Sequence, residues 1–313
     1  MSTYKQIHGT NIEVLSSDPA NPVEGQVWYN STSNTVKANF NNPGSWSTGG
    51  DLNAVNYASA AVGIQTAALD FGGLETPVDT ESYNGTNWTE VNNLNTAKSF
   101  LAGAGTQTAA LAFGSPLGSA LTETWNGTNW TEVNDLNTGR RQLAGCGTNT
   151  AALAFGGESP GVSDEAVTET WNGTNWTEVN DLNTGRSSLA GAGTNTAALA
   201  FGGSPPTAVT ESWNGTSWTE VNDLNTARSE LAGAGATNTA ALAFGGNPRT
   251  GVTETWNGTS WTEVGDMGAA RYFLAGAGTN TAALAISGYG PAGAISSVEE
   301  FNAGPQTITF TDS

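Results

Sequence analysis

Acidic and basic residues recur at fixed positions along the chain, once in each copy of a repeated segment. A glutamate precedes the first tryptophan of a copy, an aspartate follows the second, and an arginine comes five residues after that aspartate. The residues concerned are Glu123, Glu169, Glu211 and Glu254, then Asp135, Asp181, Asp223 and Asp266, and finally Arg140, Arg186, Arg228 and Arg271. Recurring carboxylates could ligate calcium, but no loop has the Asp-rich spacing of a calcium site. We therefore interpret these residues as a structural ion pair at each junction between units, worth about 0–1 kcal/mol if exposed.

Side chains suited to nucleophilic or soft-metal chemistry are scarce. The chain has one histidine, His8, and one cysteine, Cys146, which are too few for a zinc or copper site or for an intrachain disulfide. Cys146 stands where other copies have Ala104, Ala192, Ala234 and Ala277, so we expect it to be a small buried side chain. We expect no catalytic residue, cofactor or metal, and therefore a protein that is not an enzyme.

The charge balance excludes several classes of partner. Among 313 residues there are 28 acidic and 9 basic side chains, which gives a net charge of −19. Nucleic acids and anionic membranes need a dense basic surface, so neither is expected as a partner. No apolar run approaches the roughly 18 residues of a membrane span, and the first residues lack the apolar core of a signal peptide. We expect no membrane insertion.

A tandem repeat organises most of the chain. The segment TAALAFGG and its variants begin at Thr66, Thr108, Thr150, Thr196, Thr239 and Thr281, with spacings of 42 to 46 residues. An aromatic residue followed by asparagine recurs in step, at Tyr83, Trp125, Trp171, Trp213, Trp256 and Phe301. Six copies at this spacing indicate an array of similar structural units.

Each copy reads as four short strands. In the copy from Leu143 to Arg186, apolar or alternating runs lie at 143–147, 150–157, 167–171 and 176–179, and Asn172-Gly173 suits a tight hairpin turn. No helical periodicity is present. Such units predict an all-β propeller of six four-stranded blades, with seven as the alternative.

The pattern resembles the kelch repeat over residues 59–310. The matching positions in one copy are Gly156, Gly157, Trp171, Trp176, Leu182 and Arg186. Gly114-Ser115 and Ser287-Gly288 break the double glycine, and no tryptophan follows Phe301. The resemblance implies a kelch-type β-propeller. The copper-radical galactose oxidases resemble this architecture, but their chemistry needs histidine and tyrosine ligands and a cysteine–tyrosine crosslink, which one histidine and one alanine-like cysteine do not provide.

The tryptophans are expected to hold neighbouring blades together. The two of each copy flank a four-residue turn, so they either pair across a hairpin or face neighbouring blades. They are Trp125, Trp130, Trp171, Trp176, Trp213, Trp218, Trp256 and Trp261. Each aromatic ring buries roughly 150–250 Å², which makes them the main source of adhesion between units.

The N-terminal 50 residues are expected to be a separate module ahead of a propeller over 51–313. Phe40 to Trp46 is a candidate seventh relative of the tryptophan hairpin, so the alternative is that this segment completes or covers a terminal blade. Residues 18–40, with a predicted strand at Gln26–Asn30, resemble β-hairpin segments of bacteriophage tail and fibre proteins. That resemblance implies a virion protein that leaves the cell by lysis and attaches to other virion proteins through this module.

The loops between the second and third strands differ between copies, whereas the other turns are nearly constant. They span residues 74–79, 115–120, 158–166, 204–208, 247–251 and 289–295. Candidate binding residues in them are Glu75, Pro116, Leu117, Glu158, Asp164, Pro205, Pro206, Pro248, Arg249, Tyr289 and Pro291. Variable loops on a rigid scaffold are a usual place for recognition, although neutral drift in solvent also produces them.

These observations favour a bacteriophage virion structural protein, a tail, fibre or particle-surface adhesin that binds a host surface glycan or protein. The alternative is a kelch-type protein-binding scaffold or cell-surface adhesin of a bacterium or eukaryote. A redox or hydrolytic enzyme is a third class, which would need a bound metal.

Overall fold

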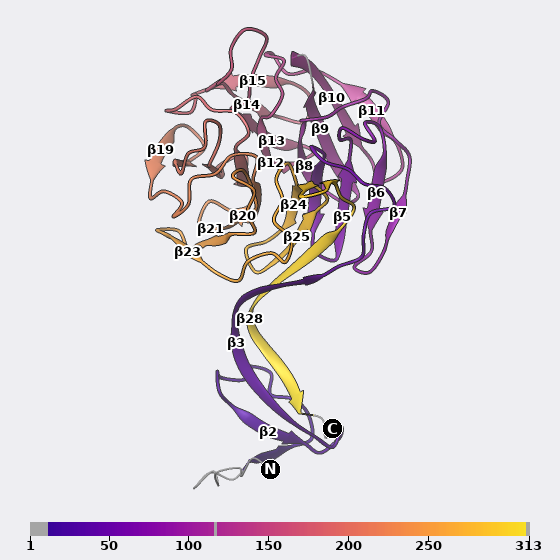
Figure 1. The fold of residues 1–313 in the computed structure, drawn as a ribbon, viewed down its shortest axis with the longest axis vertical. Helices are drawn as coiled ribbons and strands as arrows, with labels where there is room; N and C mark the ends of the chain where they lie inside the picture. Colours follow the sequence, from indigo (N-terminus) through magenta and orange to yellow (C-terminus); the bar gives the residue numbers. More distant parts are fainter. Residues whose placement is uncertain (1–11, 116–117, 311–313) are drawn as a thin grey trace. The chain divides into compact units, whose positions relative to one another are not determined.

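The computed structural model describes residues 12–115 and 118–310, and the regular elements of this part are β-strands (Figure 1). No helix among these residues is long and apolar enough to cross a membrane. The chain divides into two units, which are Gly44–Asn302 and a smaller one made of Met1–Pro43 with Ala303–Ser313. Each unit is described separately.

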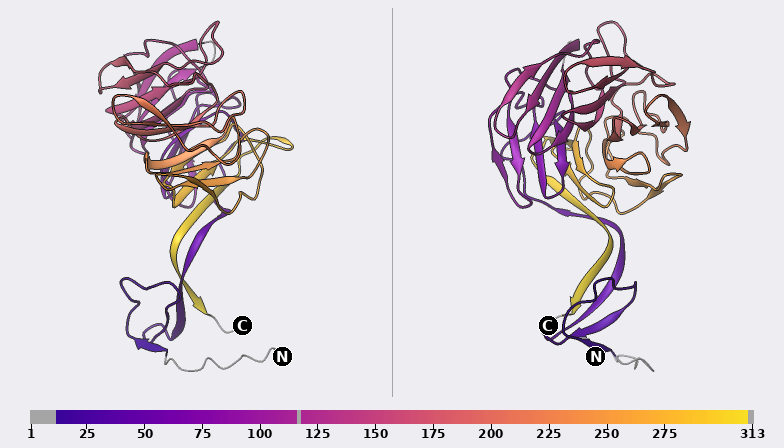
Figure 2. Two further views of the ribbon diagram at one scale, coloured as in Figure 1. Left: turned by 90° about the vertical axis from the view of Figure 1, so that its left-hand side faces the viewer. Right: turned by 180° about the vertical axis from the view of Figure 1, so that it is seen from behind.

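The larger unit is a β-propeller with five blades that each consist of four consecutive strands. Neighbouring strands in a blade are antiparallel, and the strand order follows the chain. The blades are β4 (Ala60–Ile64), β5 (Ala67–Phe71), β6 (Thr80–Tyr83) and β7 (Trp88–Glu90); β8 (Ala102–Thr106), β9 (Ala109–Ser115), β10 (Ser119–Trp125) and β11 (Trp130–Val133); β12 (Ala144–Thr148), β13 (Ala151–Phe155), β14 (Thr168–Trp171) and β15 (Trp176–Val179); β16 (Ala190–Thr194), β17 (Ala197–Phe201), β18 (Thr210–Trp213) and β19 (Trp218–Val221); and β20 (Ala232–Thr237), β21 (Ala240–Phe244), β22 (Thr253–Trp256) and β23 (Trp261–Glu263). Figure 2 shows these blades around a common centre.

The innermost strands are rich in glycine and alanine because they crowd around the centre. They line a central channel together with β24 (Ala275–Gly278), the innermost strand of the sixth copy. A Cβ atom on Gly145 of β12 would lie 2.5 Å from Cζ of Phe113 in the preceding blade. Small residues are therefore a packing requirement at this radius.

The expectation of six four-stranded blades, or seven, is wrong, because only five copies form such a blade. The sixth copy contributes β24, β25 (Ala282–Ile286) and β28 (Val298–Phe310) to a larger sheet, in which β3 (Thr35–Thr48) lies next to β28. Within the propeller unit, we call β24, β25, residues 298–302 and residues 44–48 the closing sheet. The short strands β26 (Tyr289–Gly290) and β27 (Gly293–Ala294) form a small hairpin in the segment of chain between β25 and β28.

The N-terminal boundary also differs from the expected one at residue 50. Residues 44–50 belong to the propeller unit, and residues 40–46, expected to form a hairpin, lie within the single strand β3. The reason is that the sixth copy has no second tryptophan of its own, and Trp46 takes that place. Its ring lies 5.2 Å from Phe301 and 5.0 Å from Phe244 of the preceding blade.

The tryptophans of the blades serve both roles that the sequence left open. Trp125 is the register partner of Trp130 across the hairpin, with ring centroids 5.4 Å apart. Trp130 also packs 4.9 Å from Phe71 of the preceding blade, and its Nε1 donates a hydrogen bond to Thr80 Oγ1. All eight tryptophans of this set are buried. Each of the four junctions between consecutive blades therefore has its own apolar core.

Three of the four repeated glutamates pair with an arginine of the preceding copy inside the protein, and Glu123 lies 3.7 Å from Lys98 Nζ instead. Arg140 Nη2 lies 2.9 Å from Glu169 Oε1, and neither side chain is exposed to solvent. Arg186–Glu211 and Arg228–Glu254 repeat this pair. The repeated aspartates instead accept from backbone within their own blade, as Asp135 does from Thr122 N–H. The estimate of 0–1 kcal/mol for an exposed pair therefore does not apply, since breaking a buried pair costs more.

The smaller unit contains the predicted N-terminal hairpin. Strand β2 (Val27–Asn30) is antiparallel to β3, and β1 (Glu13–Leu15) runs parallel to β2. Asp18 holds the unit together by accepting hydrogen bonds from Trp28 Nε1 and Asn30 Nδ2 and by pairing with Lys37 Nζ at 2.6 Å. The Lys37 contact, with these hydrogen bonds, lowers the pKa of Asp18 to about 2.

Candidate functional site

The variable loops lie on one face of the propeller, together with the connections that lead into the innermost strands. Isolated bridges join the two kinds of segment in several sheets, as in Ser187 with Ser204 and Tyr272 with Tyr289. We call these loops and connections the variable face. The nearly constant Asn-Gly turns lie at the other ends of the strands, where Asn172 Oδ1 accepts from the N–H groups of Thr174 and Asn175.

The candidate residues in these loops differ in exposure. Glu75, Asp164, Pro205, Pro206, Pro248, Arg249 and Pro291 are exposed, and Glu158 and Tyr289 are half-buried. Pro116 and Leu117 lie outside the described residues. The described loop residues are spread over several copies, and the structure does not gather all of them at one point.

Six residues, one from each copy, form a closed ring at the centre of the variable face. We call Ala58, Phe100, Gln142, Ser188, Glu230 and Phe273 the mouth ring. The backbone N–H of each donates to the carbonyl oxygen of the previous one, at 2.8 to 2.9 Å, and Ala58 N–H completes the circle at Phe273. All six have φ between 51° and 57°, in the left-handed region that non-glycine residues rarely adopt. The closed circle of hydrogen bonds holds this backbone in place.

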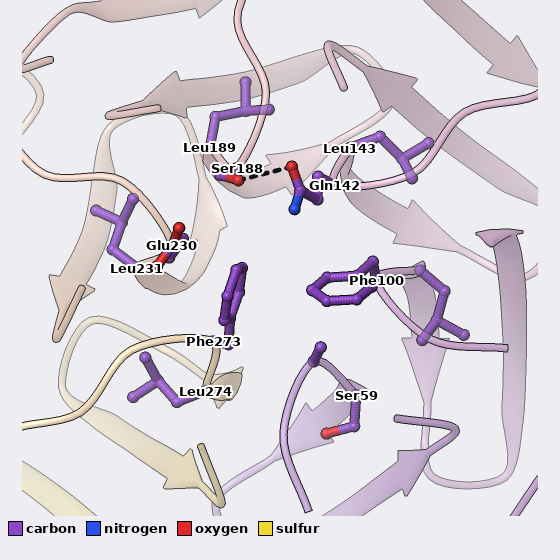
Figure 3. Close-up of a pocket in the computed structure, with 12 residues that line it drawn as sticks. Ser59, Phe100, Gln142, Leu143, Ser188, Leu189, Glu230, Leu231, Phe273 and Leu274 are labelled. Carbon is purple, nitrogen blue, oxygen red and sulfur yellow. Dashed lines mark hydrogen bonds between the residues drawn. The ribbon is translucent and has the colours of Figure 1, made fainter. Parts of the chain in front are cut away.

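A cavity of about 110 Å³ opens within the mouth ring. Figure 3 shows the rings of Phe100 and Phe273 at this cavity; they meet edge to face, 5.2 Å apart. On the polar side, Ser188 Oγ donates to Gln142 Oε1 at 3.1 Å. The leucine after each mouth-ring residue, from Leu101 to Leu274, also lines the cavity, and Ser59 stands in that place in the first copy. The cavity therefore has an aromatic side and a polar side within an apolar frame.

Glu230 is the one charged side chain among the residues that line this cavity. It is half-buried, and its Oε2 atom is inaccessible to solvent and finds no hydrogen-bond donor among the described residues. Burial raises the pKa of this carboxyl group. Glu230 follows Ser188 and precedes Phe273 in the mouth ring, so a half-buried carboxyl group next to one aromatic residue gives the cavity a site that favours positive charge over negative charge.

More aromatic side chains extend outward from Phe273. Tyr272 lies 5.4 Å from Phe273, and Tyr289 lies 5.5 Å from Tyr272 and 5.2 Å from Tyr57. Arg249, in another variable loop, lies over the Tyr272 ring at 5.4 Å. This sector connects the mouth ring with two of the loops that the sequence singled out.

A second hollow of about 500 Å³ lies under the loop from Glu158 to Ser163. Arg141 lines it and forms an ion pair with Glu158. This ion pair satisfies both charges, so the hollow has no unpaired charged group comparable with Glu230.

The candidate chemical residues from the sequence do not assemble into a reactive centre. Cys146 is buried in the channel wall, and burial raises the pKa of its thiol to about 12. Within residues 12–115 and 118–310, no three histidine, cysteine, aspartate or glutamate side chains gather in a way that could hold a metal ion. His8 lies outside the described residues.

The sequence reasoning missed the mouth ring, although a signal for it was present. The two residues before each LAG or related segment vary between copies, whereas the residues on both sides are nearly constant. The closed hydrogen-bonded circle itself has no signature in the sequence. Its six members share no single residue type, and none is the glycine that usually marks a positive φ.

No protein-family model matches this chain, and no curated protein matches it.

Proposed function

We propose that the protein is a non-enzymatic recognition protein that uses its propeller to present the variable face to a ligand. One observation carries this proposal: the differences between otherwise near-identical copies are concentrated on one face and meet at its centre, in the mouth ring. Neutral drift in solvent would leave these substitutions without mutual contacts. Instead, Phe100, Phe273, Tyr57, Tyr272 and Tyr289 form a connected set of aromatic contacts.

We further propose that the propeller, kelch-type in its repeat, is displayed on a bacteriophage particle as a tail, fibre or surface adhesin for a host glycan or protein. The smaller unit would attach it to other virion proteins. In support, six of the ten large exposed hydrophobic side chains among the described residues belong to that unit: Ile12, Val14, Val23, Val27, Phe40 and Phe310. Apolar surface concentrated on a small unit is typical of an attachment site.

The recognition proposal is tested by adhesion of the purified protein to a glycan array and to a panel of bacterial cells. The variant Tyr272→Ala with Arg249→Ala changes the variable face, and Asn172→Ala with Asn214→Ala changes turns at the opposite face as a matched control. We expect the first pair to reduce adhesion and the second to leave it unchanged. Adhesion lost only in the control, or absent throughout, would contradict the proposal.

The virion proposal needs its own measurement. Mass spectrometry of purified particles should find the chain in a fixed stoichiometry with the other particle proteins. Detection in cell lysate alone, with none in particles, would instead favour the alternative of a cellular protein-binding scaffold.

A further inference from the structure

The mouth-ring cavity offers little to an anion. In the mouth ring, every backbone N–H already donates to the neighbouring carbonyl oxygen, so no main-chain donor of these six residues points to a ligand. Glu230 is the only charged group in the lining, and it is negative. Anion sites rely on free N–H groups or on cationic side chains; the six mouth-ring N–H groups are engaged, and no cationic side chain lines the cavity.

The same cavity provides two features that attract an organic cation. The faces and edges of Phe100 and Phe273 form one side, and aromatic faces attract ammonium groups within about 6 Å. Glu230 precedes Phe273 in the mouth ring (Figure 3), and its Oε2 atom has no donor among the described residues. An alkylated ammonium group suits an apolar frame of this kind, because it needs no hydrogen bonds.

We propose that the mouth-ring cavity binds an alkylated ammonium group, with Phe100 and Phe273 contacting its methyl groups and Glu230 providing the opposite charge. This deepens the proposed recognition function and rests on it, since it assigns a ligand chemistry to the centre of the variable face. The cavity of about 110 Å³ is several times the roughly 10–15 Å³ that a single water occupies on this measure, so it admits a group of several heavy atoms. A bare metal ion is a poorer occupant, because Glu230 is the only carboxylate in the lining.

Calorimetric titration of the full chain with choline tests the proposal directly. The neutral isostere 3,3-dimethylbutan-1-ol has the same shape without the charge, so it separates cation recognition from apolar filling. We expect choline to bind at least about tenfold more tightly than the isostere. Phosphocholine, titrated in parallel, distinguishes a free ammonium compound from an ammonium group carried on a phosphate, and binding of either choline or phosphocholine supports the site.

Variants then place the binding in the cavity. Glu230→Gln keeps the size of the side chain and removes its charge, and Phe273→Leu removes one aromatic ring; each should weaken choline binding by about tenfold or more. Glu220→Gln, at an exposed position of β19, is the matched control and should bind as the parent does. Thermal unfolding of each variant checks that the propeller is intact.

Three results would overturn the proposal. The first is equal affinity for choline and the neutral isostere. The second is no binding of choline or of phosphocholine, and the third is choline binding that neither variant weakens. None of these results affects the outcome of the adhesion experiment on the variable face. Failure of the ammonium site can therefore be distinguished from failure of the recognition function.

Discussion

Trp46 Nε1 donates a hydrogen bond to Thr253 Oγ1 at 2.9 Å, although the two residues are 207 positions apart. The same contact recurs within the repeat, where Trp261 Nε1 donates to Thr210 Oγ1 at 3.1 Å. A residue near the N-terminus thus takes the place of the tryptophan that the sixth copy lacks. The closing sheet is therefore completed by chain from both ends of the propeller unit.

Two deletions should separate the smaller unit from the closing strand. Removal of residues 1–43 leaves Trp46 in place, and we expect a cooperative thermal transition close to that of the full chain. Removal of residues 1–50 exposes the edge of β28 and the ring of Phe301, and should lower the melting temperature strongly or abolish the transition. Because Trp46 is half-buried, Trp46→Ala should cost less than the roughly 3–5 kcal/mol of a fully buried Trp→Ala change. Circular dichroism melts measure all three, and equal stability of the two deletions would contradict this role of Trp46.

The buried pair of Arg140 and Glu169 gives a second prediction. Arg140→Met leaves a carboxylate inside the protein without its cation, which should cost about 3–5 kcal/mol of unfolding free energy. The double variant Arg140→Met with Glu169→Gln removes both charges and should recover a large part of that loss. Urea unfolding measures the free energies, with the exposed Glu178→Gln as control. A single variant as stable as the parent would show that the pair is dispensable.

Asp70 makes the stability depend on pH. Other copies have alanine at the position of Asp70, as at Ala112. Burial raises the pKa of Asp70 to about 8, although a hydrogen bond donated by Ser59 Oγ at 2.9 Å acts in the opposite direction. Between about pH 4 and pH 8 the folded protein then holds a proton that the unfolded chain has released. The contribution of Asp70 to stability is therefore full below about pH 4 and is lost as the pH rises through 8.

The substitution Asp70→Ala should remove this part of the pH dependence. We expect the variant to gain stability over the parent at about pH 8, and to gain less at about pH 5. Asp70→Asn, which retains a partner for Ser59, should lose the same slope. Urea midpoints of the three proteins at both pH values provide the comparison, and parallel pH profiles would show that Asp70 does not titrate in this range.

Cys146 should behave as an inert part of the channel wall. Because it is buried and the pKa of its thiol is raised to about 12, a thiol reagent at about pH 8 should label the protein only after unfolding. Cys146→Ala matches the residue of other copies and should cost far less than the roughly 2 kcal/mol of a typical large-to-small core change. Rapid labelling of the folded protein, followed by absorbance, would contradict this burial.

The repeat unit could be predicted closely from the sequence, because its signals are local. The expected runs at 143–147, 150–157, 167–171 and 176–179 correspond to β12, β13, β14 and β15 within a few residues. Alternation, small residues and an Asn-Gly turn determine these strands within about ten residues of chain. The number of complete blades could not be predicted in this way, since it depends on which distant segment pairs with β28.

The ion pairs and the mouth ring also depend on contacts between distant segments, which the sequence does not reveal. The recurrence of Glu169 and Arg140 indicates a structural pair. The packing of one sheet on another determines that Arg140 reaches the glutamate of the next copy, 29 residues further on, and that both side chains are fully buried. The mouth ring likewise joins residues 42 to 46 positions apart, and closes between Ala58 and Phe273, through backbone hydrogen bonds that side-chain identities do not encode.

The circle of backbone hydrogen bonds at the channel mouth has a consequence for how this molecule changes over generations. The main chain of Ala58, Phe100, Gln142, Ser188, Glu230 and Phe273 closes the circle, so its backbone hydrogen bonds do not depend on which side chain stands at each position. Under the proposed recognition function, ligand preference would therefore change by single substitutions in the mouth ring while its circle of backbone hydrogen bonds stays the same.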